Sequence, residues 1–296
     1  MNKNLIISLF LCYTINFFAQ NQHLIIETDS IKIFDTYLSK NTLNNLSPTF
    51  YKNGVLYASS YNSNRYGIYF SDLKTKIQPI KVNARFQLGK VAVYNNEIYF
   101  TGNSNRVDAN SEYKLKIYKG ILKEDKITKV KLLDICKNPY NYGHPSISKD
   151  GNTMVITTNE RGQFHLQILK RNSSNKWIKQ EAAFIIPRNF TLINPTLFDN
   201  NTIYFSSNMK DGNLKRVISK NVDGKLVVGD LFYEEDSFNI YKIEKIAGSW
   251  SLPQKMNVLN SEFDDLDVLF INKKSGYITT SRFDNNDNIF YFELKH

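Results

Sequence analysis

The sequence contains few of the side chains that usually carry catalytic or metal chemistry. Of its 296 residues, two are cysteine and four are histidine. No histidine lies in a His-x-x-x-His or comparable spacing with a second ligand, so the sequence predicts no zinc site. Cys12 lies in the N-terminal apolar run, and Cys136 follows an apolar stretch. We expect Cys136 to be a buried thiol, alone in the mature chain and therefore without an internal disulfide.

Apolar runs long enough to cross a bilayer are absent after the N-terminus. Lys3 precedes the apolar stretch Leu5–Phe18, and Ala19 and a polar segment follow, which is the layout of a secretory signal peptide. The stretch is shorter than the roughly 20 apolar residues that a spanning helix needs, which disfavours the alternative of a membrane anchor. Cys12 is not preceded by the small residue of a lipidation signal. The sequence predicts a signal peptide over 1–19 and export to the periplasm, the outer membrane or the cell surface.

Blocks of like charge are also missing, although the chain is basic. It carries 38 Lys and Arg against 28 Asp and Glu, a formal net charge of +10. The lysines are spread along the chain, and no block of five basic residues occurs. This pattern favours a solvated surface over a nucleic-acid interface. We expect a monomer that binds no nucleic acid and attracts a partner with an acidic surface.

No long helical period is present, and short β-type runs alternate with turn residues instead. Tyr and Phe together number 38, and Asn, Asp, Gly and Ser separate the runs. This pattern is typical of an all-β sandwich, barrel or propeller. A strand–turn–strand unit recurs in five legible copies, at residues 47–60, 89–103, 144–159, 194–208 and 267–282.

The spacing of the copies favours a propeller. Their matched positions 57, 99, 155, 204 and 277 are separated by 42, 56, 49 and 73 residues, and a four-stranded blade takes roughly 40–50. We predict a single β-propeller of five four-stranded blades over 42–296, with six blades as the alternative. The longest gap indicates an insertion rather than a degenerate blade around 224–241. The segment 20–41 is a candidate to close the ring by adding a strand to the last blade.

The copies resemble the TolB-like, WD-type propeller repeats of bacterial envelope proteins. Ser148–Asn159 (SKDGNTMVITTN) matches the diagnostic phrase of that family, and Thr202–Asn208 (TIYFSSN) is a second clear copy. Leu259–Asp265 resembles the approach to the last blade in envelope proteins of the Bacteroidota. There the propeller is commonly joined to an OmpA-like domain, and some such proteins belong to type IX secretion and gliding machinery. No OmpA-like domain follows in this sequence, so the resemblance implies no peptidoglycan anchoring.

Signatures of propeller enzymes are not recognisable. The Gly-x-Ser-x-Gly of prolyl peptidases is missing. Ser148-Lys149-Asp150 begins like the Asp-box of sialidases, but Gly151 follows at once and indicates a turn. His144 occupies the position that Ser47 and Asn194 hold in other copies, which favours a structural role. The sequence therefore predicts no catalytic residue, no metal ligand and no cofactor.

An acidic group near the C-terminus leaves calcium open as an alternative. Clustered carboxylates bind Ca²⁺, but no EF-hand spacing is present, and solvated loop acids are commoner. The candidates gather around Asp264–Asp267, namely Glu262, Asp264, Asp265 and Asp267, with Asp284 and Asp287 further on.

A basic residue follows the second strand of each copy at a similar offset. Repetition would bring such side chains to one face of the disc, where they are candidate partner-binding residues. The alternative is that each one caps its own blade by hydrogen bonding to loop carbonyls. The set is Arg65, Arg106, Arg161, Lys210 and Arg282.

These features together favour a non-catalytic scaffold that binds a protein partner in the cell envelope, with a link to type IX secretion or envelope assembly. The ground is a rigid repeat that carries loops of varying sequence. The alternative is a glycan-binding or glycan-hydrolysing propeller. Carboxylates gathered in a deep channel would favour hydrolysis, and exposed aromatic side chains would favour glycan binding.

Overall fold

The computed structural model describes residues 23–295 apart from 41–42, 61–64, 83–87, 109–110, 188–189, 210–213, 234–236 and 284–285. The predicted signal peptide over 1–19 therefore lies outside the described residues. The described part is all-β, with 25 strands. None of its segments forms a helix of the length and apolarity needed to cross a membrane.

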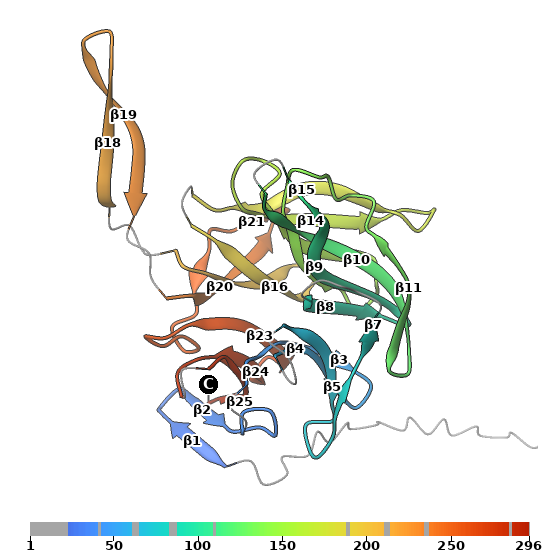
Figure 1. Ribbon diagram of the computed structural model, residues 1–296. Coiled ribbons are helices and arrows are strands. Elements are labelled where there is room, and N and C mark those ends of the chain that lie inside the picture. The colour runs from blue at the N-terminus through green and yellow to red at the C-terminus, as the bar shows by residue number, and fades with distance from the viewer. Residues whose placement is uncertain are drawn as a thin grey trace, which may run out of the picture.

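The strands form a five-bladed β-propeller, which confirms the predicted fold (Figure 1). The main strands of each blade are antiparallel and follow one another outward from the centre of the ring. Blade 1 consists of β3 (Asn45–Tyr51), β4 (Gly54–Ser59), β5 (Gly67–Ser71) and β6 (Ile77–Pro79). Blade 2 consists of β8 (Leu88–Tyr94), β9 (Glu97–Val107), β10 (Tyr113–Lys123) and β11 (Lys126–Leu132), with the short β7 (Lys81–Val82) added in parallel at its edge. Blade 3 consists of β12 (Tyr142–Ile147), β13 (Thr153–Thr158), β14 (His165–Arg171) and β15 (Trp177–Ile185).

The fourth and fifth blades depart from this pattern. Blade 4 consists of β16 (Leu192–Asp199), β17 (Thr202–Ser207) and β20 (Asn239–Ile246), with the short strands β21 (Ser249–Trp250) and β22 (Gln254–Lys255) against β20. Blade 5 consists of β23 (Asp265–Asn272), β24 (Ser275–Thr280) and β25 (Asn288–Leu294). Its outer strands are β2 (Ile31–Phe34) and β1 (Leu24–Glu27), which come from the other end of the chain.

The pairing of β2 with β25 closes the ring. Ile31 lies opposite Leu294, and Phe34 lies opposite Tyr291. The hydrophobic core follows the same circular plan, because each of its five clusters lies between two consecutive blades. The cluster between blades 5 and 1, for example, contains Tyr57 and Ile289. No blade can bury its faces without its neighbours, which is the physical reason that the ring must be closed.

A bulge near the start of the inner strand recurs in the blades. Ser47, His144 and Asn194 all have left-handed backbone angles, with φ of 55°, 52° and 49°. Each precedes a proline, and the pairing register shifts at the same point. Because the bulged residues are not paired in the ladder, the missing N–H of the proline leaves no hydrogen bond unmade. The structure thus places His144 in the slot that the repeats predict.

The long gap in the repeat holds an inserted hairpin. β18 (Leu214–Val222) and β19 (Lys225–Tyr233) pair with each other in a separate two-stranded sheet. They lie in sequence between β17 and β20, which are neighbours in blade 4. Asp223 and Gly224, with φ of 53° and 80°, form the two-residue turn that suits such a hairpin. The insertion is confirmed, and the alternative of a sixth blade is excluded. In Figure 1 the hairpin stands apart from the ring.

Candidate functional site

A buried ion pair crosses the central channel of the propeller. Lys90 on β8 of blade 2 places its Nζ 2.7 Å from Oδ2 and 2.9 Å from Oδ1 of Asp267 on β23 of blade 5. Nζ also donates to Thr196 Oγ1 at 2.9 Å and to the Asn194 carbonyl at 3.3 Å, both on blade 4. Lys90 is 4% exposed and Asp267 is 1% exposed. The pair and its partners thus join blade 2 to blades 4 and 5, neither of which is its neighbour in the ring.

This cluster is suited to structure rather than to substrate chemistry. Burial lowers the pKa of Lys90 and raises the pKa of Asp267, and the close contact between the two charges opposes both shifts. Thr196 donates to Asp267 Oδ1 at 3.1 Å, and Ser47 also bonds to the Asp267 carboxylate. With these partners and almost no exposed surface, the carboxylate offers no free edge to a ligand.

His144 lies in the same channel wall as a neutral imidazole. Its Nδ1 is 2.9 Å from Thr157 Oγ1, and its backbone N–H donates to Thr101 Oγ1 at 2.8 Å. Burial, and then the charge of Lys90, lowers the pKa of His144 to about 3. The ring is therefore unprotonated at neutral pH and cannot serve there as a general acid.

Three of the basic residues that the sequence singled out, Arg65, Arg161 and Arg282, lie on the loops that follow the second strands of blades 1, 3 and 5. Arg282 bonds to Asp265 Oδ1 and to the Leu259 carbonyl within its own blade region. Arg65 and Arg161 are exposed on separate loops. Arg106 lies on β9, but its side chain is outside the described part, as is the whole of Lys210. For Arg282 the arrangement matches the alternative in which the guanidinium caps its own blade.

The acidic group around Asp264–Asp267 is divided among separate partners. Asp265 binds Arg282 and also accepts from Ser261, Asp267 binds Lys90, and Asp264 Oδ1 accepts from the Phe238 N–H. Within the described residues, no three His, Cys, Asp or Glu side chains gather in a way that could hold a metal ion.

Cys136 is half-buried beside the cluster between blades 2 and 3. Its Sγ lies 3.9 Å from the Ile117 carbonyl, and burial raises the pKa of the thiol to about 11. A thiol of that pKa is protonated at neutral pH, so Cys136 is a poor nucleophile.

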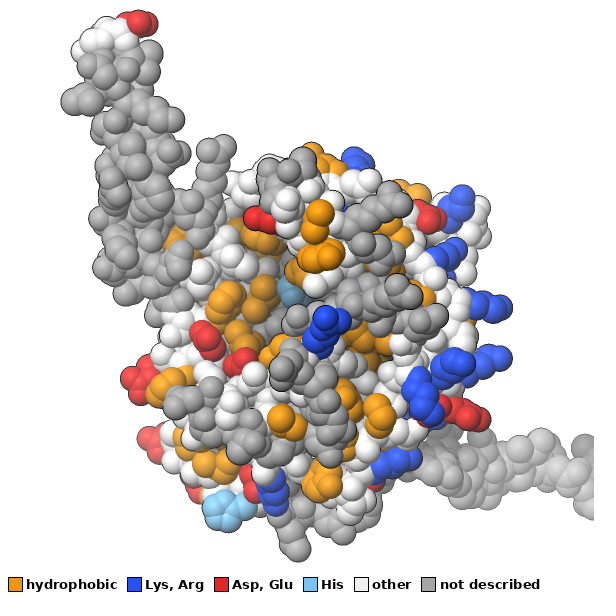
Figure 2. Space-filling model, in the orientation of Figure 1, with side chains coloured by type: hydrophobic (Ala, Val, Ile, Leu, Met, Phe, Trp, Pro, Cys, Tyr) orange, Lys and Arg blue, Asp and Glu red, His pale blue; other side chains and the backbone are white. Residues whose placement is uncertain are grey.

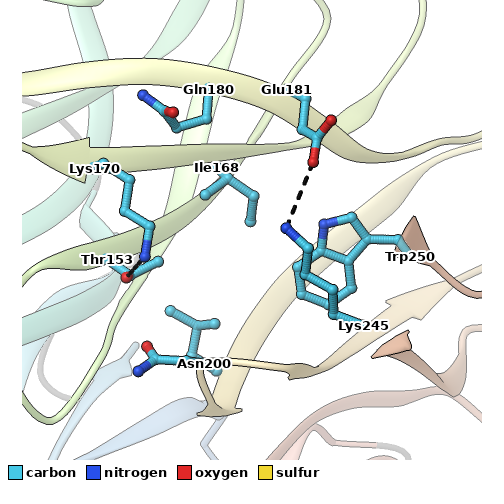
Figure 3. A pocket seen from close by; sticks show the side chains of 9 residues that line it. Thr153, Ile168, Lys170, Gln180, Glu181, Asn200, Lys245 and Trp250 are labelled. Carbon is cyan, nitrogen blue, oxygen red and sulfur yellow. Dashed lines mark hydrogen bonds and ion pairs between the residues drawn. The ribbon is translucent and has the colours of Figure 1, made fainter. Parts of the chain in front are cut away.

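A cleft of about 270 Å³ opens between blades 3 and 4 and is the better candidate site (Figure 3). Its size lies just below the roughly 300 Å³ at which small-molecule pockets begin. The lining combines a short apolar floor, an indole ring and several hydrogen-bonding side chains. The nine residues are Thr153, Ile168, Lys170, Gln180, Glu181, Leu197, Asn200, Lys245 and Trp250.

A tight hairpin places the indole in the cleft. Ala247 and Gly248, with φ of 49° and 88°, form a two-residue turn that folds β21 back onto β20. Trp250 therefore lies directly opposite Lys245 in the ladder. Lys245 Nζ is 5.7 Å from the centroid of the Trp250 ring. Nε1 of Trp250 is enclosed and has no hydrogen-bond partner in the described structure, which is unusual for an indole N–H.

A bulge in the outermost strand of blade 3 supplies the opposite wall. Leu169 pairs with Lys179 and Gln167 pairs with Ala182, so two residues of β15, Gln180 and Glu181, oppose a single residue of β14. Such a bulge redirects side chains, and here both of them line the cleft. Gln167 Nε2 donates to the carbonyl of Gln180 at 2.6 Å, which fixes the bulge.

Two lysines bring positive charge to the cleft against one carboxylate. Lys170 donates from Nζ to Thr153 Oγ1 at 2.5 Å. Lys245 Nζ lies 3.6 Å from Glu181 Oε1, and the two side chains are 33% and 67% exposed. An ion pair so open to water contributes little stability and is readily exchanged for another partner. Figure 3 shows Lys170 and Lys245 on opposite sides of the cleft.

Sequence reasoning missed this cleft. Its residues come from six strands and a turn of two blades. Thr153, Leu197 and Asn200 belong to copies of the repeated motif, but the other six lie outside it. One usable signal was Trp250, because the chain has only two tryptophans. This one directly follows a Gly-Ser turn rather than lying inside a strand of the repeat, where a core residue would be expected.

Comparison with known proteins identifies the fold and no family. No protein-family model matches the sequence, and no curated protein does. Among solved structures, the PQQ-bound aldose sugar dehydrogenase of Streptomyces coelicolor matches 90% of this chain and 98% of its own, at 14% identity and a TM-score of 0.53. A thermostable family-43 glycoside hydrolase matches 86% of this chain and 93% of its own, at 10% identity and a TM-score of 0.50.

The propeller that the TolB-like resemblance implied is confirmed by the arrangement of the strands, and the finer resemblance is not. A chain assigned as TolB from Agrobacterium tumefaciens matches over 82% of this chain and 71% of its own, at 10% identity and a TM-score of 0.43. A link to the Bacteroidota or to type IX secretion finds no support among these structures.

These neighbours correct our functional prediction. At 10% to 14% identity they establish the fold and transfer neither substrate nor mechanism. Two of them are nevertheless named as sugar-acting enzymes, so the propeller architecture gives no ground for expecting a protein-binding scaffold without activity. The predictions of a non-catalytic scaffold and of no enzymatic function are contradicted, and the glycan-related alternative fits better.

Proposed function

We propose that the protein is a carbohydrate-binding propeller and that the cleft between blades 3 and 4 holds the sugar. The observation that carries the proposal is the indole of Trp250, which lies beside amide and carboxylate groups and has an unpartnered Nε1 in a cleft of about 270 Å³. The sugar-acting enzymes that share the architecture support the same class of ligand.

The lining matches the two kinds of surface that a sugar presents. The C–H face of a pyranose is apolar and packs against an aromatic ring, while its hydroxyl groups need donors and acceptors. Gln180 and Asn200 each offer both a donor and an acceptor, and Glu181 offers acceptors only. Few other small molecules need an apolar face and so many hydroxyl partners together.

The cleft as it stands supports recognition more directly than hydrolysis. Glycosidases generally use two carboxyl groups that flank the scissile bond, and Glu181 is the one carboxylate among the nine lining residues. An assay for sugar release therefore accompanies the binding assay, with Glu181→Gln as the variant. Turnover that this variant loses would add catalysis to the same site.

We also propose that the protein acts in the cell envelope. The signal-peptide layout of residues 1–19 and the resemblance to envelope propellers of the Bacteroidota support this placement. N-terminal sequencing of the mature protein tests it. Export predicts a chain that begins at Gln20, whereas a chain that retains Met1 would contradict export.

A glycan array followed by calorimetry on the best ligands tests the carbohydrate proposal. We expect at least one mono- or oligosaccharide to bind, and Trp250→Ala to weaken it at least tenfold, which is about 1.4 kcal/mol. Trp250→Phe should retain part of the affinity, because the ring remains. The matched control is Leu252→Ala, which removes an apolar side chain that is 86% exposed two residues away. The proposal fails if no saccharide binds or if Trp250→Ala binds as well as the wild type.

A further inference from the structure

The charge of the cleft narrows the class of sugar. From the residues that line it, we infer that the cleft selects an acidic saccharide, one whose ring carries a carboxylate as in a uronic acid. This inference rests on the proposed function, because it assigns the ligand of the same site. It goes beyond that function because the stacking surface of Trp250 alone would accept neutral and acidic sugars equally.

The first argument is the balance of charge inside the cleft. The lining contains two ammonium groups, those of Lys170 and Lys245, and one carboxylate, that of Glu181. Gln180, Asn200 and Thr153 are neutral. The lining therefore carries one excess positive charge that a ligand carboxylate would neutralise, although the charge of Lys170 also acts on the Asp150 carboxylate outside the lining. A neutral sugar would leave that charge uncompensated in a partly desolvated space.

The second argument is that both ammonium groups are available to a ligand. Lys245 is held by Glu181 at 3.6 Å, a distance beyond a hydrogen bond, and both partners are open to water. A ligand carboxylate at 2.7–2.9 Å would form a stronger contact than the one it replaces. The hydrogen bond that Lys170 makes in the cleft is to the neutral hydroxyl of Thr153, which leaves two of its three donor hydrogens for other acceptors.

The third argument is the placement of the lysines around the indole. Lys170 comes from blade 3, whereas Lys245 and Trp250 come from blade 4, and the two lysines lie on opposite sides of the cleft, directed at Thr153 and Glu181 (Figure 3). A pyranose ring that stacks on Trp250 would direct its equatorial substituents sideways, toward these two walls. A carboxylate on the ring carbon next to the ring oxygen could thus reach either lysine without leaving the indole.

The buried lysine in the channel provides an internal contrast. Lys90 is 4% exposed and already holds both oxygens of Asp267, so it has no capacity for a ligand anion. The cleft lysines lack such an internal carboxylate at hydrogen-bond distance. The excess charge of the cleft is therefore a local property and does not follow merely from the overall charge of +10.

Calorimetry with matched sugars tests the inference. The probes are galacturonic acid oligomers and galactose oligomers of equal length, together with glucuronate and glucose, at low and high salt. We expect the acidic member of a pair to bind at least tenfold more tightly at low salt, with the preference shrinking as salt rises. The variant Lys170→Gln/Lys245→Gln should lose that preference while retaining most of the affinity for the neutral member.

A second lysine pair supplies the control. Lys273→Gln/Lys274→Gln removes the same charge from exposed positions in the turn of blade 5 and should leave the preference intact. The inference is overturned if neutral and acidic sugars bind equally, or if the control pair reduces the preference as much as the cleft pair does. If no saccharide of either kind binds, the carbohydrate proposal itself fails, so the two failures are distinguishable.

Discussion

At the scale of single residues, His144 couples the channel to pH. The pKa of the folded-state imidazole is lowered to about 3 by burial and by the charge of Lys90, whereas an unfolded histidine titrates near 6.5. Between these values the unfolded chain binds a proton that the folded protein does not. The stabilising contribution is therefore complete above about pH 6.5 and is lost progressively as the pH falls toward 3.

This linkage predicts the behaviour of one substitution. Between pH 7 and pH 5 the titration of His144 should cost about 2 kcal/mol of unfolding free energy, at about 1.4 kcal/mol per pKa unit. His144→Asn places in the slot the residue that blade 4 has at Asn194, where the backbone is also left-handed. Urea unfolding at both pH values should show a flatter pH dependence for the variant. Parallel curves for the two proteins would contradict the prediction.

Local sequence patterns predicted individual backbone positions better than side-chain roles. The sequence placed Ser47, His144 and Asn194 at equivalent positions because each precedes a proline in its copy of the repeat. The structure gives all three a left-handed backbone angle. The charge that acts on His144 could not be predicted from the sequence, because it comes from Lys90 on another blade. Sequence reasoning placed the histidine but could not supply the charge that faces it.

At the scale of elements, the inserted hairpin is separable from the blade that carries it. β18 and β19 pair only with each other, while β17 and β20 pair directly across the insertion. Replacing Leu214–Tyr233 by a short Gly/Ser linker should therefore leave the propeller folded, with the melting temperature changed by no more than a few degrees. Circular dichroism with thermal melting checks this. A collapse of the melting transition would show that the hairpin helps to hold blade 4.

The repeat predicted the strands correctly where it is regular. It did not predict the additional elements of blade 4, which departs from the repeat. The overlong interval before Tyr277 correctly indicated an insertion, because a plain blade cannot fill 73 residues. The cleft depends instead on a bulge at Gln180 and on the turn at Ala247-Gly248. A similar bulge lies between β10 and β11, where Lys129 and Val130 oppose Gly120. The bulge at Gln180 and the turn at Ala247-Gly248 both lie outside the repeated strand–turn–strand unit, so comparing its copies could not reveal either one.

At the scale of the whole molecule, the ion pair between Lys90 and Asp267 links blades that share no interface. Lys90→Met would leave a carboxylate that is 1% exposed without its cation. The expected cost is about 3–5 kcal/mol of unfolding free energy. The double variant Lys90→Met/Asp267→Leu removes both charges and should recover much of that loss. Urea denaturation at neutral pH measures all three proteins, and equal midpoints for the wild type and Lys90→Met would contradict this role.

The exposed basic side chains gather on the surface near β11, away from the buried pair of Lys90 and Asp267. Lys and Arg side chains gather along one edge of the molecule near β11 (Figure 2), where Lys123, Lys126, Lys129 and Lys131 are exposed. The short strand β7 pairs with β11 only at Lys126 and Ile127. Lysines on the remainder of this edge discourage pairing with other chains. The overall charge therefore has a structural use at this edge that is separate from the cleft.

The pairing of β2 with β25 also sets the order of events in folding. Synthesis delivers the chain from its N-terminus, so β1 and β2 emerge early and remain without a blade to pair with until more than 250 later residues have followed. During that interval the inner blades can form on neighbours already present, but the ring stays open along one side. The final closure is a contact of very long sequence separation, which makes it slow and leaves sheet edges exposed meanwhile. The protein is thus most vulnerable to aggregation just before its last strand arrives.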